Sequence, residues 1–287
     1  MDKLEAVRNM QDYIDNHIDE RITLNDLAKI SLYSPWHSYR IFIDVLGLSI
    51  SDYIRRLRLS KSALKLRDEK IKILDIAYEY GYESVDGYQR AFHKEFGVNP
   101  YEYLKNPVPI CLFIPYRKYD NKEKKIMSNV SNVFVSVIEK SERKVIIKRG
   151  VKADNYMDYC NEVGCDVWGI LTSIKSISGE PVCLWLPKNL IKEGTSEYVQ
   201  GVEVDVNYSG IIPDGFEVIT LPKATYLMFN GEPFNEENYC EAIEALWEAM
   251  KKYNPENIGY KWDDSNPRIQ LEPVGERGYI ELKAIKK

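Results

Sequence analysis

Histidine is scarce in this sequence, and its distribution excludes several kinds of catalytic site. The chain of 287 residues holds three histidines, His17, His37 and His93, all in its first third. Residues 94–287 therefore lack the imidazole needed for a Ser-His-Asp or Cys-His pair and for histidine-based metal sites. The five cysteines are an odd number without a CxxC motif, which favours reduced core thiols over a disulfide framework.

Long apolar runs and an excess of positive charge are missing too. The uncharged run at 106–116 is too short to span a bilayer, and the charged first ten residues lack the apolar core of a signal peptide, so we expect a cytoplasmic protein. The 39 basic residues are outnumbered by 44 acidic ones, for a net charge of −5. Locally, however, residues 40–72 hold nine basic and four acidic side chains. Such a patch suits phosphate, and a solvated helix face gives the same count.

What is present is the composition of an ordinary globular chain, with 44% hydrophobic and 29% charged residues. At this length two domains are the default expectation. We predict a first domain at 1–107, a linker at 108–129 with two prolines and a charged run, and a second domain at 130–287.

The first hundred residues predict helices and contain an internal repeat. Asp26-Leu27-Ala28 matches Asp75-Ile76-Ala77 at an offset of 49 residues. After a slip of one residue the offset becomes 50, and the matched pairs are Ser34/Ser84, Arg40/Arg90, Phe42/Phe92 and Gly47/Gly97. Each copy has a short helix with a central alanine, a turn, and a second helix with an outward arginine and an inward phenylalanine. Two helix-turn-helix units joined by a long helix at 50–66 are therefore predicted.

From residue 130 the pattern changes to strands. Strand runs are predicted at 133–138, 144–148, 167–172, 182–186, 198–205, 216–221, 223–229, 268–272 and 279–282, and helices at 153–163 and 236–253. This order predicts an α+β domain of two β-β-α-β-β-type repeats, with helices packed on one side of an antiparallel sheet.

Residues 4–105 resemble the DNA-binding domain of the AraC/XylS family of transcription activators, an all-α double helix-turn-helix domain. The segment beginning at Ile73, "ILDIAYEYGYESVDGYQRAFHKEFGVNPYEYL", has the residues of the family signature at the expected places: Asp75, Ala77, Gly81, Tyr82, Ser84, Phe92, Phe96, Gly97, Pro100 and Tyr103. The resemblance implies two recognition helices, at 34–42 and 84–93, which enter successive major grooves roughly 34 Å apart.

The resemblance also implies which side chains face the DNA. In the first helix they are Trp36, His37, Tyr39 and Arg40, and in the second Ser84, Val85, Asp86, Gln89 and Arg90. Arg40 is the best candidate for a base contact because its guanidinium can pair with a guanine edge. Asp86 repels phosphate, so the second helix is expected to contribute mainly through Arg90.

Residues 130–287 resemble the GyrI-like effector-binding domain of Rob-like regulators, through Val167-Trp168-Gly169, residues 201–204 and the closing segment 280–285. The resemblance implies a cleft for amphipathic, often aromatic and cationic molecules, with a carboxylate in an aromatic cage. The candidate aromatic residues are Trp168, Trp185, Tyr208, Tyr226, Phe229 and Trp262. The family's glutamate is expected where this chain has Gln270, with Glu272 on the same strand face, which leaves a neutral effector open.

The sequence thus predicts a bacterial one-component transcriptional regulator. Its expected partners are promoter DNA, a small-molecule effector and RNA polymerase, and no cofactor, metal or enzymatic activity is expected. Two alternatives stay open: a protein that sequesters a small molecule, and a hydrolase activity in the second domain, because some GyrI-like domains resemble hydrolases.

Overall fold

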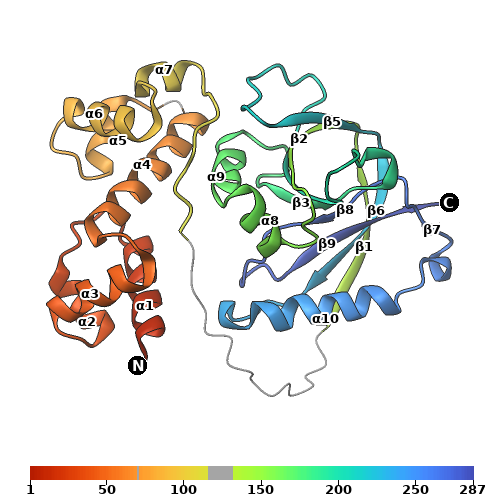
Figure 1. Ribbon diagram of the computed structural model, residues 1–287, viewed down its shortest axis with the longest axis horizontal. Helices are drawn as coiled ribbons and strands as arrows, with labels where there is room; N and C mark the ends of the chain where they lie inside the picture. Colours follow the sequence, from red (N-terminus) through yellow and green to blue (C-terminus); the bar gives the residue numbers. More distant parts are fainter. Residues whose placement is uncertain (70, 116–131) are drawn as a thin grey trace. The chain divides into compact units, whose positions relative to one another are not determined.

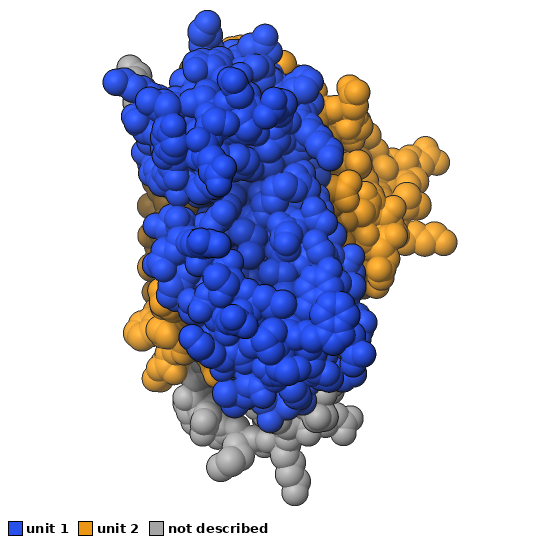
Figure 2. Space-filling model, turned by 90° about the vertical axis from the view of Figure 1, so that its left-hand side faces the viewer, with its two compact units in different colours: residues 1–124 blue, residues 125–287 orange. Residues whose placement is uncertain are grey.

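A computed structural model describes residues 1–69, 71–115 and 132–287. The chain divides into two compact units, unit 1 at 1–124 and unit 2 at 125–287 (Figures 1 and 2). Among the described residues, no helix is long and apolar enough to cross a membrane.

The described part of unit 1 is helical. Its helices are α1 (Lys3–Asn16), α2 (Leu24–Ser31), α3 (Pro35–Leu46), α4 (Ile50–Asp68), α5 (Ile73–Glu79), α6 (Val85–Phe96) and α7 (Pro100–Lys105). The helices α1–α3 and α5–α7 form two lobes at the two ends of α4, and Figure 2 shows these lobes one above the other. The arrangement agrees with the predicted pair of helix-turn-helix units.

The two repeats share their helix caps. Ser34 and Ser84 each accept a hydrogen bond from the backbone N–H three residues on, at the start of α3 and α6. Both helices have 12 residues and end at a left-handed glycine, Gly47 or Gly97. The turns before them differ, because Leu32 adopts φ 55° where the second copy has Gly81 at φ 77°. The first turn therefore holds a leucine in a conformation that favours glycine.

Each lobe has its own hydrophobic core, and α4 contributes to both. Tyr53 and Leu57 pack with Phe42 of α3 in the first core. Two residues after Leu57, Leu59 begins the second core, which also contains Ala63 of α4, Phe92 of α6 and Tyr103 of α7. Both α3 and α6 are thus anchored on one continuous helix.

An extended segment at 107–115, here called the strap, lies along α4 (Figure 1). Ile110 and Leu112 are buried in the second core, and Phe113 packs against the first. The backbone N–H of Phe113 donates to the Ser60 hydroxyl at 2.8 Å. The residues at 108–115, predicted as the beginning of the linker, therefore contact the helices of unit 1, while 116–129 lie outside the described residues.

Unit 2 is built on a sheet. Its strands are β1 (Val133–Lys140), β2 (Arg143–Arg149), β3 (Val182–Trp185), β4 (Tyr198–Val204), β5 (Glu217–Leu221), β6 (Ala224–Gly231), β7 (Lys261–Trp262), β8 (Arg268–Gln270) and β9 (Ile280–Lys286). Its helices are α8 (Tyr156–Val163), α9 (Asp166–Ser173) and α10 (Tyr239–Lys252). The sheet order is β1-β6-β9-β8-β3-β4-β2-β5, with β7 paired to β9, and every pairing is antiparallel.

The sheet order reveals two similar halves that meet at the centre. Along the chain, β2 precedes α8 and α9, and β3 and β4 follow them. In the same way β6 precedes α10, and β8 and β9 follow it. The halves join where β3 pairs β8, with Cys183 opposite Gln270. Gln270 is in turn opposite Glu281 of β9, and paired residues point to the same face. Because Cys183 packs toward α9 and Glu281 contacts α10, the helices cover one face of the sheet.

One predicted strand is wrong. Residues 167–172 form helix α9, whose Leu171 is fully buried and whose Val167 is nearly so. The segment is apolar at nearly every position, and so short an apolar run does not distinguish a buried helix from a buried strand.

Candidate nucleic-acid interface and ligand pocket

Helix α3 presents an aromatic and basic surface. Trp36 is 68% exposed and stacks on Tyr39, with ring centroids 5.7 Å apart and an interplanar angle of 17°. Arg40 is exposed one residue further on, and His37 packs on Tyr33 at 4.7 Å. Ser38, Ile41 and Phe42 are buried and fix the opposite side of the helix. Trp36 and Arg40 are therefore held outward by an anchored inner face, whereas His37 and Tyr39 are half-buried and Tyr39 also packs against the first core.

Helix α6 has the same construction with fewer contact groups. Tyr88 and Phe92 anchor it, and Ser84 caps it. Asp86 and Arg90 are exposed, whereas Gln89 is half-buried and Val85 packs against the second core. Among the contact residues predicted on α6, the cation is therefore Arg90. It occupies the position that matches Arg40 in α3.

The basic side chains of α4 mainly bind the protein itself. Arg55 and Arg56 both pair with Glu95 of α6, at 2.8 and 2.7 Å. Lys61 pairs with Asp15, and Lys65 with Glu79. The pKa of Glu95 is lowered: burial alone raises it, but the two guanidinium groups overcome that effect. These four residues of the patch form ion pairs that tie α4 to α1, α5 and α6.

Unit 2 contains a buried carboxylate surrounded by aromatic residues. Glu281 is fully buried, and its Oε1 accepts hydrogen bonds from Trp247 Nε1 at 2.5 Å and from the Tyr279 hydroxyl. Arg268 donates to both carboxylate oxygens, at 2.6 and 2.9 Å. The Arg268 guanidinium carbon lies 4.1 Å from the ring centroid of Trp185 and 5.4 Å from that of Trp247. We call Glu281, Trp247, Tyr279 and Trp185 the cage.

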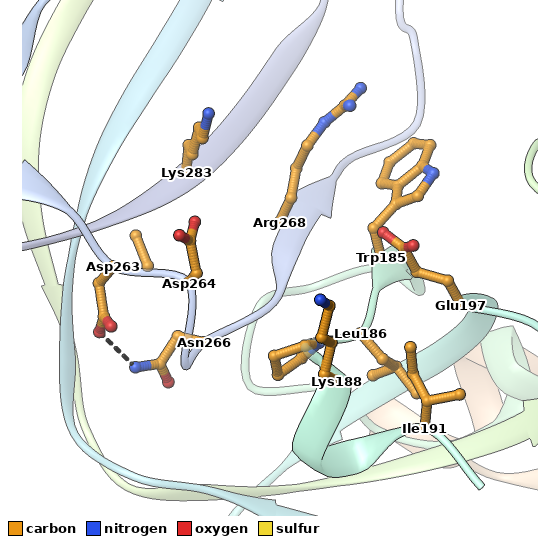
Figure 3. Close-up of a pocket in the computed structure, with 12 residues that line it drawn as sticks. Trp185, Leu186, Lys188, Ile191, Glu197, Asp263, Asp264, Asn266, Arg268 and Lys283 are labelled. Atoms are coloured by element: carbon orange, nitrogen blue, oxygen red, sulfur yellow. Dashed lines mark hydrogen bonds between the residues drawn. The ribbon is translucent and has the colours of Figure 1, made fainter. Parts of the chain in front are cut away.

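A pocket of about 270 Å³ opens beside the cage. It is lined by Trp185, Leu186, Pro187, Lys188, Ile191, Glu197, Asp263, Asp264, Asn266, Arg268, Lys283 and Ala284. In Figure 3 the side chains of Arg268 and Lys283 extend from the same side of the sheet, and Arg268 lies alongside the Trp185 ring. Desolvation lowers the pKa of Lys283; the Asp264 carboxylate opposes this effect, and nearby Arg268 adds to it. The pocket therefore combines apolar walls with a few charged groups, as small-molecule sites do.

The structure disperses the predicted effector residues. Trp185 lines the pocket. Trp262 is not among the lining residues, but the Lys283 ammonium lies 4.2 Å from its ring centroid. Gln270 is the cross-strand neighbour of Glu281. The others lie elsewhere in unit 2: Trp168 is buried near the exposed Glu272, Tyr208 follows β4, Tyr226 contacts Arg143, and Phe229 packs on Tyr253.

Comparison with known proteins identifies unit 1. Residues 27–106 match the model of a helix-turn-helix domain. The chain is 40% identical over 107 residues to the right origin-binding protein of Escherichia coli K12, a match that covers 37% of either chain. It is 35% identical over 103 residues to the regulatory protein SoxS of Salmonella typhimurium, covering 36% of this chain and 96% of SoxS. The chain belongs to the AraC/XylS family of transcriptional regulators.

A solved structure covers the same region. It is the C-terminal domain of AraT, a response regulator from Geobacillus stearothermophilus, at 30% identity and a TM-score of 0.33, covering 35% of this chain and 84% of that one. The AraC/XylS match spans α3 and α6, and the cage and pocket lie outside it. The chain spans 37% of the length of the right origin-binding protein.

Sequence reasoning identified Trp185 but missed the other residues that form the cage and the arginine paired with them. Glu281 lies in a segment that marks the GyrI-like resemblance, but no site role was predicted for it, nor for Arg268, Trp247 or Tyr279. Those residues come from α10, β8, β9 and the residue before β9, and the register of β8 with β9 brings Arg268 and Glu281 together. The one available signal was an alternating strand with a charged residue at an inward position, Ile280-Glu281-Leu282.

Proposed function

We propose that this chain is a one-component transcriptional regulator that binds promoter DNA through α3 and α6 and a small molecule through unit 2. The observation that carries the DNA-binding half is the matched pair of helices. Both have 12 residues, a serine cap, a glycine end and an exposed arginine at the matching position. Membership of the AraC/XylS family supports the same function.

The length of α4 suits two contacts with one face of a duplex. Its 19 residues span about 28 Å at 1.5 Å per residue. Successive major grooves on one face are roughly 34 Å apart. Because α4 contributes to both cores, it acts as a rigid spacer between α3 and α6. On α3, Arg40 offers bidentate contact to a guanine edge, and Trp36 and Tyr39 offer apolar contact to sugar or a thymine methyl.

The pocket beside the cage supports the ligand-binding half of the proposal. A ligand changes DNA affinity only if it binds more tightly to one conformation of the protein than to another. The predicted place for this coupling is the connection at 106–129, of which the strap is described and 116–129 are not. RNA polymerase is the further partner that activation requires.

The test is specific DNA binding by the Arg40→Ala variant. Full-length protein first selects its preferred sequence from a random duplex pool, and affinities for that sequence are then measured. We expect Arg40→Ala to lose about 1–3 kcal/mol of specific binding, because a bidentate arginine–base contact is removed. Arg90→Ala is expected to weaken binding with a smaller loss of sequence preference, since Asp86 lies beside it.

Lys251→Ala is the matched control. Lys251 is an exposed cation on α10 of unit 2, paired with Glu248, and its removal should leave DNA affinity unchanged. Equal affinity of Arg40→Ala and wild type for the selected sequence would show that α3 does not read bases. Failure to select any sequence would contradict the proposed function itself.

A further inference from the structure

Arg58 lies in the middle of α4 and contacts both helix-turn-helix lobes. Its Nε donates a hydrogen bond to the backbone carbonyl of Ile18 at 2.7 Å, and its Nη2 donates to that of Glu20. Both carbonyls lie between α1 and α2, in the first lobe. In the second lobe, the Arg58 guanidinium lies against Gly81, where an added Cβ would be 2.9 Å from Nη1. One side chain therefore joins a turn of each lobe.

Both turns precede helices that position the DNA-reading surfaces. The turn at 17–20 precedes α2, which packs with α3 in the first core. Gly81 lies three residues before Ser84, which caps α6. A guanidinium is a rigid planar fork of donors, so contacts made through it fix direction as well as distance. The Arg58 contacts therefore couple the position of α3 to that of α6.

Ion pairs on either side of Arg58 also cross between the lobes. Arg56 precedes Leu57, which packs in the first core, but it pairs with Glu95 of α6 in the second lobe. Lys61 follows the beginning of the second core, but it pairs with Asp15 of α1 in the first lobe. Lobes that only packed on α4 could slide by small side-chain rearrangements, as helices do in shear motions. Contacts that cross between the lobes oppose such sliding.

We propose that Arg58 is a positioning residue that holds the two recognition helices at one separation and rotation, so that the protein binds two DNA segments at a single fixed spacing. The proposal rests on the DNA-binding half of the proposed function and adds the residue that sets the spacing. Arg58 acts through the two turns, because its Nε and Nη2 are committed to backbone carbonyls.

A spacing series on the selected duplex tests this assignment. Hydroxyl-radical footprinting of the full-length protein first locates the two contacted segments, and one base pair is then inserted between them. The insertion moves one segment by about 3.4 Å and turns it by about 35° around the duplex axis. We expect the wild type to bind the lengthened duplex at least about tenfold more weakly than the original one.

Arg58→Lys should reduce this spacing penalty to less than about threefold. Lysine keeps the positive charge, but a single ammonium does not reproduce the fork that reaches both carbonyls. With the lobes uncoupled, α6 can follow its displaced segment. A general loss of stability lowers both affinities and cancels in their ratio. Arg67→Lys is the matched control and should keep the wild-type ratio, because Arg67 also lies on α4 but pairs with the adjacent Asp68.

Gly81→Ala tests the same contact from the second lobe. Gly81 has φ 77°, and a Cβ added there would displace the Arg58 guanidinium. We expect the spacing penalty to fall as it does in Arg58→Lys. Gly97→Ala is the control, because Gly97 has φ 73° and no neighbouring side chain of the described residues lies within 4 Å of a Cβ added to it. It introduces similar backbone strain, keeps the Arg58 contact and should keep the wild-type ratio.

Circular dichroism checks that each variant is folded, and Gly81→Ala decides if Arg58→Lys is not. A wild type that binds the original and the lengthened duplex equally overturns the proposal. A folded Arg58→Lys variant that keeps the wild-type penalty overturns it as well. Both results leave the DNA-binding function standing, because the protein still binds its selected sequence. Failure of the wild type to select any sequence contradicts the proposed function itself.

Discussion

At the scale of single residues, unit 2 is organised around two fully buried carboxylates, Glu203 and Glu281. Each is neutralised by an arginine of a neighbouring strand. Glu203 accepts hydrogen bonds from Arg143, Lys140 and the Ser178 hydroxyl. Arg143 is itself 1% exposed, whereas Arg268 opens onto the pocket. The Glu203 pair is therefore closed, whereas the Arg268 side of the Glu281 pair borders the pocket.

Glu203→Gln should destabilise unit 2 in a pH-dependent manner. Burial alone raises the pKa of Glu203, but Lys140 and Arg143 overcome this and hold it below its ordinary value. A lowered folded-state pKa contributes stability above the unfolded-state pKa, and this contribution disappears as pH falls through the folded-state value. At pH 7 the substitution leaves Arg143 buried without a counter-charge, which costs about 3–5 kcal/mol. The difference from wild type should shrink below about pH 4.5.

Urea unfolding at pH 7 and pH 4, followed by tryptophan fluorescence, measures this effect. Four of the five tryptophans lie in unit 2, so the signal reports mainly on that unit. Glu248→Gln is the control, because Glu248 is an exposed carboxylate on α10. An equal destabilisation of Glu203→Gln at both pH values would contradict the electrostatic explanation.

At the scale of elements, the strap connects the two helix-turn-helix lobes. The Phe113 ring packs edge-on against Tyr53 at 5.2 Å, and Tyr53 packs edge-on against Phe42 of α3 at 5.3 Å. The Arg56 guanidinium lies 4.7 Å from the Phe113 ring centroid and also pairs with Glu95 of α6. A continuous set of contacts therefore runs from α3 through the strap to α6.

Phe113→Ala should destabilise unit 1 by about 1–3 kcal/mol, through the lost aromatic pair, the lost cation–π contact and the exposed apolar surface. Thermal unfolding followed by the helical signal of circular dichroism measures the change. Ile114→Ala is the neighbouring control, because Ile114 is 39% exposed and should change stability little. Similar effects of the two substitutions would show that the strap is not a specific connection.

The sequence predicts the recognition helices well and the packing of the strap poorly, for a physical reason. Ser34-Pro35 and Gly47 define α3 through local backbone chemistry, and so the sequence indicates the beginning and end of the helix. The packing of the strap depends on side chains more than fifty positions away, such as Ser60. The prolines and the charged run of this region indicate only a linker. The Arg268–Glu281 pair likewise depends on strand register. Long-range pairing is the part of the fold that local patterns do not specify.

At the scale of the whole molecule, charge is balanced internally. The net charge is −5, and the cations of α4 that pair with Asp15, Glu79 and Glu95 are already neutralised. DNA binding must therefore depend on the cations that remain exposed near the recognition helices, such as Arg40, Arg90 and Lys94. Each phosphate that one of these cations neutralises adds to the salt dependence of binding.

Substitution of Lys94 and of Arg55 compares an exposed cation with one that is already paired. Lys94 lies in the last turn of α6 and is exposed, whereas Arg55 pairs with Glu95. Specific binding should weaken as salt rises, with a log–log slope of about −0.9 for each phosphate neutralised. Lys94→Ala should make the slope shallower by about one without changing sequence preference. Arg55→Ala should leave the slope unchanged, because that charge is already paired. The slopes are obtained from DNA affinities measured across a series of salt concentrations. If the slope of Arg55→Ala becomes shallower by as much as that of Lys94→Ala, Arg55 of α4 contacts phosphate and the prediction is wrong.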